Sequence, residues 1–299
     1  MNLIDLFQSF KTQEQALEYL ETTRWHGKPV CPYCHDQRVY RHASGDRAEQ
    51  RWQCQNCHRA FAVTVGTIFH RTHVPLKNWF LVLALMLNAK KSASAYQIAR
   101  DLGMRRPTVW SMMHRIRVAM SSDPAQSALL HGIVEADETY VGGKPRKGNR
   151  RDDDDPKHHG RGRATKKTPV IGVIERGGRV IAKPVKPKDL TRTALAKFIS
   201  QHVDRAASLL ITDEYRGYLG MSSMIRHMTI NHEIAYADGP IHTNSIEGFW
   251  SLVKRAWYGQ HHHYSRKYMP LYISEACYKF NKRGKADTFE KMIAVMVRA

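Results

Sequence analysis

Four of the five cysteines form two closely spaced pairs. Each pair has the pattern Cys-x-x-Cys, and 19 residues lie between the two pairs. This spacing is typical of a site in which four thiolates surround zinc as a tetrahedron and leave no open position for a substrate. We therefore expect a structural zinc ion bound by Cys31, Cys34, Cys54 and Cys57.

Alternatives stay open for this cluster. His35 and His58 each follow a pair directly, so either could replace one cysteine as a ligand. A Cys-x-x-Cys redox pair, or coincidence, would also give the pattern. Cys277 stands alone in a predicted helix and is expected to be an ordinary core residue.

Acidic side chains mark two predicted strands further along the chain. Glu135 and Asp137 lie in a mostly apolar stretch, residues 132–141, that predicts a largely buried strand. Asp213 follows a second buried strand, residues 209–211. A buried carboxylate is costly unless a cation or hydrogen bonds compensate it, which favours a functional role. The alternative for Asp213 is that it only caps the turn that follows.

A third acid lies on a strongly amphipathic helix predicted for residues 244–258. At about 100° per residue, one face is apolar and the adjoining stripe is polar. A simple solvated stripe is the alternative. The stripe consists of Asn244, Glu247, Ser251 and Lys254.

If Asp137, Asp213 and Glu247 converge, their repulsion requires divalent cations, and oxygen ligands favour Mg²⁺ or Mn²⁺. Two such ions about 3.5–4 Å apart can activate a nucleophile and stabilise the leaving oxygen of a phosphodiester. The composition fits a nucleic-acid substrate, because 47 Lys and Arg against 27 Asp and Glu give a net charge of +20.

A helix-turn-helix pattern precedes the acidic segments. Ser94 can cap a first helix, Gly103 suits the tight turn, and Pro107 fits the first turn of a second helix. That second helix, about residues 107–120, is predicted to enter the major groove of DNA. A plain three-helix packing module is the alternative. Its basic side chains, expected at or near the surface, are Arg105, Arg106, His114, Arg115 and Arg117, and the predicted DNA contacts are Arg105, Arg106, Thr108 and Arg115.

The order of the predicted helices and strands indicates a mixed α/β fold, and 299 residues are enough for roughly two domains.

Two other segments carry local signals. Thr12 and Gln15 predict a capping box in the N-terminal helical segment, residues 1–28. Residues 144–168 read as a Gly- and charge-rich loop that could clamp DNA electrostatically. The run Asp152–Asp155 within it fits no motif that we assign.

The longest apolar run has nine residues, which is too short to span a bilayer, and the N-terminus lacks the basic region of a signal peptide. We therefore expect no membrane partner and no secretion, but a cytoplasmic protein that joins the nucleoid when it binds DNA.

Together these residues resemble the insertion-sequence transposases of the Asp-Asp-Glu type, and more closely the zinc-ribbon-bearing IS1595 group with its ISXO2-like catalytic domain. The resemblance covers nearly the whole chain. Its motifs are Arg24-Trp25, Cys31-Pro32-x-Cys34, Cys54-x-x-Cys57, Glu135-x-Asp137-Glu138-x-Tyr140-x-Gly142-Gly143, Thr212-Asp213-x-Tyr215, His242-Thr243-Asn244-x-x-Glu247-Gly248-Phe249-Trp250-Ser251-x-x-Lys254-Arg255, His262-His263 and Tyr278-x-Phe280-Asn281.

The resemblance implies a ribonuclease-H-like catalytic domain preceded by a zinc ribbon and a helix-turn-helix. The expected boundaries are residues 1–70 for the N-terminal helix and zinc ribbon, 71–122 for the helix-turn-helix and 123–299 for the catalytic domain. It also implies metal-dependent cleavage of double-stranded DNA at terminal inverted repeats, followed by strand transfer into target DNA. Because two ends must be joined, we expect a homo-oligomer on DNA.

The resemblance assigns Asp137 and Asp213 as the first two catalytic acids. Members of this group have either Glu or Asn assigned as the third, and we favour Glu247 because a carboxylate binds a divalent ion better than an amide does. Asn244 would then be a further ligand, the helix N-cap, or both. Lys254 is expected to contact the phosphate near the scissile bond, and Arg255 the DNA backbone.

Two rival functions share most of these features. A DNA-binding regulator would have the zinc site and the helix-turn-helix, but its acids would be vestigial. A ribonuclease-H-like nuclease would hydrolyse DNA and never yield joined products.

Overall fold

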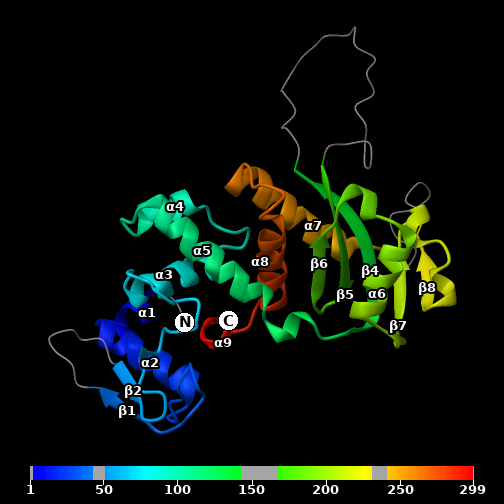
Figure 1. Ribbon diagram of the computed structural model, residues 1–299. Coiled ribbons are helices and arrows are strands. Elements are labelled where there is room, and N and C mark those ends of the chain that lie inside the picture. Colours follow the sequence, from blue (N-terminus) through cyan, green and yellow to red (C-terminus); the bar gives the residue numbers. More distant parts are fainter. Residues whose placement is uncertain (1–2, 43–50, 143–166, 231–240, 299) are drawn as a thin grey trace. The chain divides into compact units, whose positions relative to one another are not determined.

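The computed structural model describes residues 3–42, 51–142, 167–230 and 241–298 (Figure 1). Within these residues the chain divides into two compact units, each with its own core. None of the helices in the described part is long and apolar enough to cross a membrane.

The first unit combines both ends of the chain, Met1–Asp123 and Lys282–Ala299. It holds a small antiparallel sheet of three strands in the order β1-β2-β3, and a set of helices. Its elements are α1 (Leu3–Ser9), α2 (Gln13–Trp25), β1 (Val39–His42), β2 (Arg51–Cys54), β3 (Ala60–Ala62), α3 (Leu76–Asn88), α4 (Ala95–Asp101), α5 (Arg106–Ser121) and α9 (Thr288–Met296).

Local sequence signals set the helix boundaries in this unit. The predicted capping box is present, because the Thr12 hydroxyl accepts from the Gln15 N–H and the Gln15 side chain accepts from the Thr12 N–H. The Ser94 side chain caps α4 as expected. Gly103 has a φ of 61° in the turn, and Pro107 lies in the first turn of α5.

One expectation about α5 is wrong. The helix-turn-helix pattern predicts His114 and Arg117 at or near the surface, but their exposed fractions are 8% and 1%. The reason is that α5 contacts α3, α4 and α9, so most of its circumference is covered. Arg105 and Arg106 are the exposed cations at its N-terminal end.

The helix α9 completes the core of the first unit. It contacts α2, α3 and α5, and the Ile68 N–H donates to the carbonyl of Met296. Phe289 packs edge-on against Phe80. The family resemblance predicts a catalytic domain that includes residues 282–299, whereas in the structure these residues pack with Met1–Asp123.

The second unit, Pro124–Asn281, is built on a mixed five-stranded sheet with the order β6-β5-β4-β7-β8. β4 pairs antiparallel with β5 and parallel with β7, and β7 pairs parallel with β8. This mixed α/β arrangement confirms the predicted fold class. The strands are β4 (Leu130–Val141), β5 (Thr168–Glu175), β6 (Val180–Pro184), β7 (Val203–Thr212) and β8 (Arg226–Thr229).

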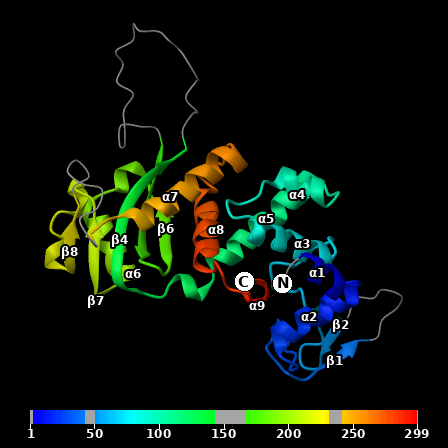
Figure 2. The same cartoon turned by 180° about the vertical axis from the view of Figure 1, so that it is seen from behind.

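Helices cover both faces of this sheet (Figures 1 and 2). Alternate residues of β4 face opposite sides, so Val134 and Ala136 pack in the core beneath α6 while Val141 packs in the core beneath α7 and α8. The helices are α6 (Arg192–His202), α7 (Asn244–Ala256) and α8 (Met269–Asn281). Short turns are η1 (Pro124–Gln126), η3 (Pro187–Asp189), η4 (Arg216–Tyr218), η5 (Met221–Ser223) and the π-helical η6 (Trp257–His261).

A glycine lets α7 approach the sheet closely. Gly172 on β5 pairs with Asp137 on β4. A Cβ on Gly172 would lie 2.7 Å from Cη2 and 2.8 Å from Cζ2 of the Trp250 indole on α7. The indole therefore occupies the space that any larger residue at this position would fill.

We predict that Gly172→Ala lowers the free energy of unfolding by about 1–3 kcal/mol, because the methyl group overpacks the contact with Trp250. Urea denaturation measures this change. Gly248→Ala is the matched control, since a Cβ there has nothing within 4 Å, and alanine should stabilise the helix interior slightly. Unchanged stability of Gly172→Ala would mean that α7 adjusts freely.

Candidate active site and zinc site

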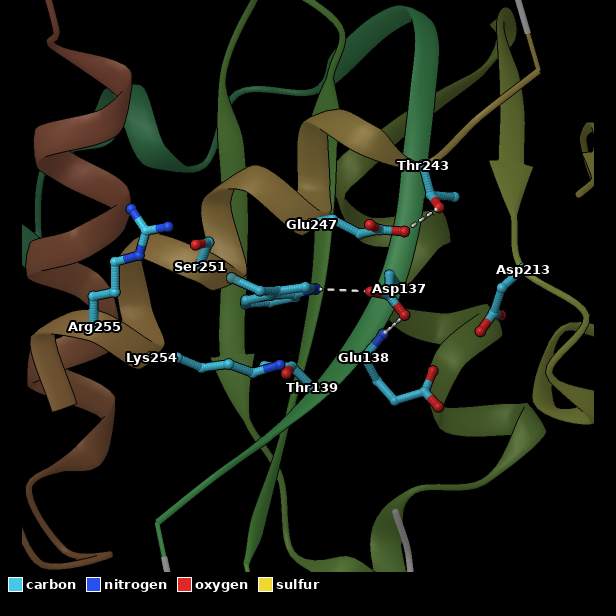
Figure 3. A pocket seen from close by; sticks show the side chains of 10 residues that line it. Asp137, Glu138, Thr139, Asp213, Thr243, Glu247, Ser251, Lys254 and Arg255 are labelled. Atoms are coloured by element: carbon cyan, nitrogen blue, oxygen red, sulfur yellow. Dashed lines mark hydrogen bonds between the residues drawn. The ribbon is translucent and has the colours of Figure 1, made fainter. Parts of the chain in front are cut away.

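The three acids singled out in the sequence line one cavity of about 510 Å³ in the second unit (Figure 3). We call it the acid cavity. Its polar lining combines carboxylates from two strands and a helix with cationic side chains from the same helix. The lining residues are Asp137, Glu138, Thr139, Asp213, Thr243, Glu247, Trp250, Ser251, Lys254 and Arg255.

The sheet register brings Asp137 and Asp213 together. β4 and β7 run parallel with Ala136 opposite Thr212, and each acid is the next residue along its chain. β7 ends at Thr212 whereas β4 continues to Val141, and the residues that follow an aligned pair project to the same side of the sheet, so the two carboxylates face the same space. The Tyr215 N–H donates to Asp213 at 3.1 Å, which holds this side chain in place.

Asp137 is held by two hydrogen bonds. Its Oδ1 accepts from the Glu138 N–H at 2.7 Å, and its Oδ2 accepts from the Trp250 indole N–H at 2.9 Å. Burial, together with the charges of Asp213 and Glu247, raises the pKa of Asp137 to about 7, and the two hydrogen bonds oppose the rise. The three acids therefore interact electrostatically, as convergence requires.

Glu247 reaches the acid cavity from the first turn of α7. The Thr243 hydroxyl donates to its Oε1 at 3.1 Å, so the carboxylate is oriented before any ligand arrives (Figure 3). Asn244 does not line the cavity and is exposed. The expectation that Asn244 is the N-cap is wrong: Thr243 occupies the N-cap position and Asn244 is the first helical residue.

Sequence reasoning missed the role of Glu135, which is fully buried on the same face of β4 as Asp137. Its Oε2 accepts from the N–H groups of Ser245 at 2.8 Å and Ile246 at 3.0 Å. Its Oε1 accepts from the Ser245 hydroxyl at 2.9 Å and from Arg176 Nε at 3.0 Å. The carboxylate of a neighbouring strand thus caps α7, the helix that carries Glu247.

The analysis also missed the pair formed by Glu138 and Tyr218. Glu138 lines the acid cavity, and the buried Tyr218 hydroxyl donates to its Oε2 at 3.3 Å. Burial and the nearby charges of Glu138, Asp137 and Asp213 raise the pKa of Tyr218 well above its usual value. The phenol therefore stays protonated and acts as a donor. Tyr218 lies in the short turn η4, which has no apolar periodicity from which its burial could have been predicted.

The cationic side of the cavity comes from the last turns of α7. Lys254 and Arg255 are both exposed and line the cavity. In Figure 3 the Lys254 side chain runs from α7 toward Thr139 on β4. An ammonium group in a cavity lined by four acidic side chains suits a substrate that carries negative charge of its own.

The four cysteines lie together as expected. Their sulfur atoms all fall within 4.8 Å of one another, which is the arrangement of a four-thiolate site. The two cysteine pairs have the same backbone conformation. The His35 N–H donates to the Cys31 carbonyl, the His58 N–H donates to the Cys54 carbonyl, and both histidines have positive φ. His35 and His58 serve as the turn residues of two equivalent knuckles and do not belong to the cluster.

The predicted DNA contacts of the helix-turn-helix differ in their surroundings. Arg105 and Arg106 are exposed, and Thr108 is half-buried. Arg115 Nη2 donates to the His70 carbonyl at 2.8 Å, and its guanidinium lies over the Trp79 ring. Arg115 thus has partners within its own unit.

Two parts of the sequence analysis lie outside the described residues. They are Gly143 of the strand motif and nearly all of the predicted loop, including Asp152–Asp155.

The strands, the acids and the four-thiolate cluster define a two-part protein with a carboxylate centre and a zinc ribbon. Residues 129–281 match the family model of the ISXO2-like transposase domain, and residues 11–60 match that of the transposase zinc-ribbon domain. The chain belongs to the ISXO2-like transposase family.

Two curated relatives are similar to this chain. An uncharacterized protein in the transposable element ISH50 of Halobacterium salinarum is 28% identical over 276 residues, covering 89% of this chain and 90% of the relative. The insertion element iso-IS1N protein InsA of Shigella dysenteriae is 41% identical over 34 residues, covering 11% of this chain and 38% of InsA.

Among solved structures, the Mos1 strand transfer complex gives a TM-score of 0.31 at 15% identity, over 73% of this chain and 74% of that chain. The Mos1 mariner paired end complex with Mn gives a TM-score of 0.33 at 13% identity, over 72% of this chain and 74% of that chain. Similarities this low add nothing to the argument from the site itself.

We predict that the purified chain carries one zinc ion and that Cys57→Ala loses it. Binding by four thiolates contributes about 10–16 kcal/mol in small modules, so the strands β1–β3 should lose hydrogen-exchange protection without it. Metal analysis and hydrogen exchange measure both effects. Cys277→Ala, which removes a buried thiol away from the cluster, should retain the zinc. Retention of zinc by Cys57→Ala would contradict the assignment.

Asp137→Asn is expected to reduce the loss of stability that the zinc-loaded protein shows between pH 5 and pH 8 when no Mg²⁺ or Mn²⁺ is added. Because the folded pKa of about 7 lies above the ordinary 3.8, the stability contributed by protonated Asp137 is complete below about pH 4 and disappears as the pH rises through 7. The amide cannot ionise. It also has only one acceptor oxygen, so the variant loses one of the two hydrogen bonds that Asp137 accepts, at every pH. The thermal midpoint of the variant relative to that of the wild type should therefore rise between pH 5 and pH 8.

Asp287→Asn is the control, because the pKa of Asp287 is lowered whereas that of Asp137 is raised. The hydrogen bond and charge of Lys291 lower the pKa of Asp287, so its loss should not stabilise the protein at pH 8. A difference between the midpoints of Asp137→Asn and the wild type that stays the same from pH 5 to pH 8 would refute the proposed electrostatic cost.

Proposed function

We propose that this chain is a transposase of the Asp-Asp-Glu type that cuts DNA at terminal inverted repeats and transfers the freed strand into target DNA. The observation that carries the proposal is the acid cavity, where Asp137, Asp213 and Glu247 face Lys254 across one space. Membership of a transposase family supports it. The functional division into residues 1–70, 71–122 and 123–299 is part of the proposal.

The acid cavity suits divalent cations. Its donors are carboxylate oxygens, which Mg²⁺ and Mn²⁺ prefer. Burial first, and then the charges of Asp213 and Glu247, raise the pKa of Asp137, and a bound cation would offset both costs of ionising it. Asp137, Asp213 and Glu247 would hold the ions. When bound, such ions supply Lewis-acid activation of the nucleophile and stabilisation of the leaving oxygen.

The side chains of this protein would perform the remaining tasks. Trp250 and Thr243 each donate one hydrogen bond to an acid, which fixes its direction and leaves other lone pairs facing the cavity. Lys254 would pair with the phosphate that carries the scissile bond. A charge fixed in this way costs no reorganisation during the reaction.

Both chemical steps exchange one phosphorus–oxygen bond for another. In cleavage, the oxygen of water bonds to phosphorus, the bond to the 3′ oxygen breaks, and that oxygen takes up a proton. In strand transfer, the new 3′ hydroxyl loses its proton and bonds to a target phosphorus, the bond from that phosphorus to the target 3′ oxygen breaks, and the leaving oxygen takes up a proton. One site can therefore serve both steps.

DNA recognition is assigned to the first unit. Arg105, Arg106 and Thr108 lie at the N-terminal end of α5, where recognition helices commonly contact DNA. Arg115 was also predicted as a DNA contact; its bond to the His70 carbonyl favours a role in positioning α5. Arg255 would contact the backbone beside the acid cavity. Because two element ends must be joined, we propose a homo-oligomer on DNA.

Glu247→Gln is expected to reduce strand transfer by about 100-fold or more, because the third anionic ligand is lost, while binding to element ends changes little. Asn244→Ala should stay within a few-fold of the wild type, since Asn244 does not line the cavity. Joined products from a plasmid with the terminal repeats, a supercoiled target and Mg²⁺ measure the rate, and gel shifts measure binding.

Asp137→Ala separates the rival functions in the same assay. A transposase loses joined products and keeps end binding, whereas a regulator retains all of its activity. A nuclease would give nicked DNA from the wild-type chain without any joined product. A large loss in Asn244→Ala with full activity of Glu247→Gln would reverse the assignment of the third residue.

A further inference from the structure

A second cavity, of about 350 Å³, adjoins the acid cavity. We call it the outer cavity. Thr139 and Lys254 line both spaces, so the two share a wall formed by β4 and α7. The residues special to the outer cavity include Gly142, Lys167, Trp257 and Tyr258. A polymer whose phosphate lies at Lys254 would therefore reach both spaces with adjacent units.

The floor of the outer cavity is formed by closely packed groups. Gly142 follows β4 with a φ of 93°, and a Cβ there would lie 3.5 Å from the Trp257 ring. Trp257 is only 4% exposed and packs edge-on against Tyr264, with ring centroids 4.3 Å apart. The end of the strand and the indole thus form a preformed surface.

Tyr258 differs from its neighbour Trp257, because 56% of its area is exposed although it is a large aromatic residue. It lies in η6, a π-helical segment that follows α7 directly. Such segments are rare and frequently occur at functional sites. An exposed aromatic ring at the edge of a cavity is a suitable platform for a flat partner.

The charges of the outer cavity identify that partner as an anion. Lys167 and Lys254 give it two positive charges against the single negative charge of Glu138, whose carboxylate also accepts a hydrogen bond from Tyr218. A positively charged groove with an aromatic side chain is the arrangement by which proteins bind single-stranded nucleic acid. A volume of about 350 Å³ is typical of a pocket for one small molecule and far too small for a duplex.

We propose that the outer cavity binds one unpaired nucleotide adjacent to the scissile phosphate, with its base against Tyr258 and its phosphate between Lys254 and Lys167. The inference rests on the proposed function and adds a step to it: a base next to the cleavage position leaves the stack when the DNA binds. Removing a base from its stack costs free energy, and stacking on Tyr258 offsets that cost.

The test uses element-end duplexes with 2-aminopurine at single positions on either side of the scissile phosphate. The fluorescence of this base rises when it is unstacked from its neighbours in DNA, and it is recorded on binding in Ca²⁺, without cleavage. With the wild-type chain we expect a rise at one position. Tyr258→Ala should lose that signal or shift it, and Tyr258→Phe, which keeps the ring, should retain it.

Cleavage in Mg²⁺ gives the second readout. Tyr258→Ala should cleave paired ends about 5- to 150-fold more slowly, the range expected for loss of one stacked base, and a mismatch at the responding position should restore much of the rate. Lys167→Ala should slow cleavage in the same direction. Leu219→Ala removes a comparably exposed side chain outside both cavities and should behave as the wild type.

The outcomes separate the two proposals. If the wild-type chain cleaves and joins ends but the fluorescence stays flat at every position and Tyr258→Ala cleaves normally, the nucleotide site is refuted and the transposase function stands. If Tyr258→Phe is as defective as Tyr258→Ala, stacking is refuted. If the wild-type chain cleaves no ends under any divalent ion, the proposed function itself fails.

Discussion

The candidate active site depends on one buried carboxylate that takes no part in its lining. Glu135 accepts hydrogen bonds from the first turn of α7, and Asp137 lies two residues further along the same face of β4. The strand that carries the first acid and the helix that carries the third are thus joined by a charge that is 0% exposed. Burying this charge is tolerable because backbone N–H groups, a hydroxyl and the Arg176 guanidinium all donate to it.

A second set of contacts, made by Trp250, also fixes the position of α7 against the sheet. Trp250 lies one turn beyond Glu247, donates to Asp137 and fills the space left by the missing side chain of Gly172. Together with the Glu135 cap, this fixes the helix at two points along its axis. The fold holds the acids close together although their charges repel. The carboxylates by themselves therefore have an unfavourable electrostatic energy that bound cations would reduce.

Much of the site was predictable because apolar runs in the sequence mark the strands, and the spacing of apolar residues marks the buried face of a helix. Asp137 and Asp213 each occur in or after an apolar run, and parallel strands then bring them together. The cysteine spacing predicted the four-thiolate cluster for the same reason. The role of Glu135 was not predictable, because alternation gives the face of a strand but not a partner more than a hundred residues away.

The errors have related causes. His114 and Arg117 looked like surface residues because α9, one of the helices that pack around α5, comes from the far end of the sequence. The edge strand β8 was missed because Arg226–Thr229 has no apolar alternation and exists only by pairing with β7. Both features are set by tertiary contacts, which override local preference.

The position of α9 also has a consequence for biosynthesis. Phe289, Met292 and Ile293 belong to the core of the first unit, yet the ribosome adds them only after all of Pro124–Asn281 has been made. Domains usually fold in the order of their synthesis, but here the unit that begins the chain must wait for its last helix. A nascent product ending near Asn281 would hold all five strands of the sheet in the second unit but would lack α9, so the core of the first unit would be incomplete.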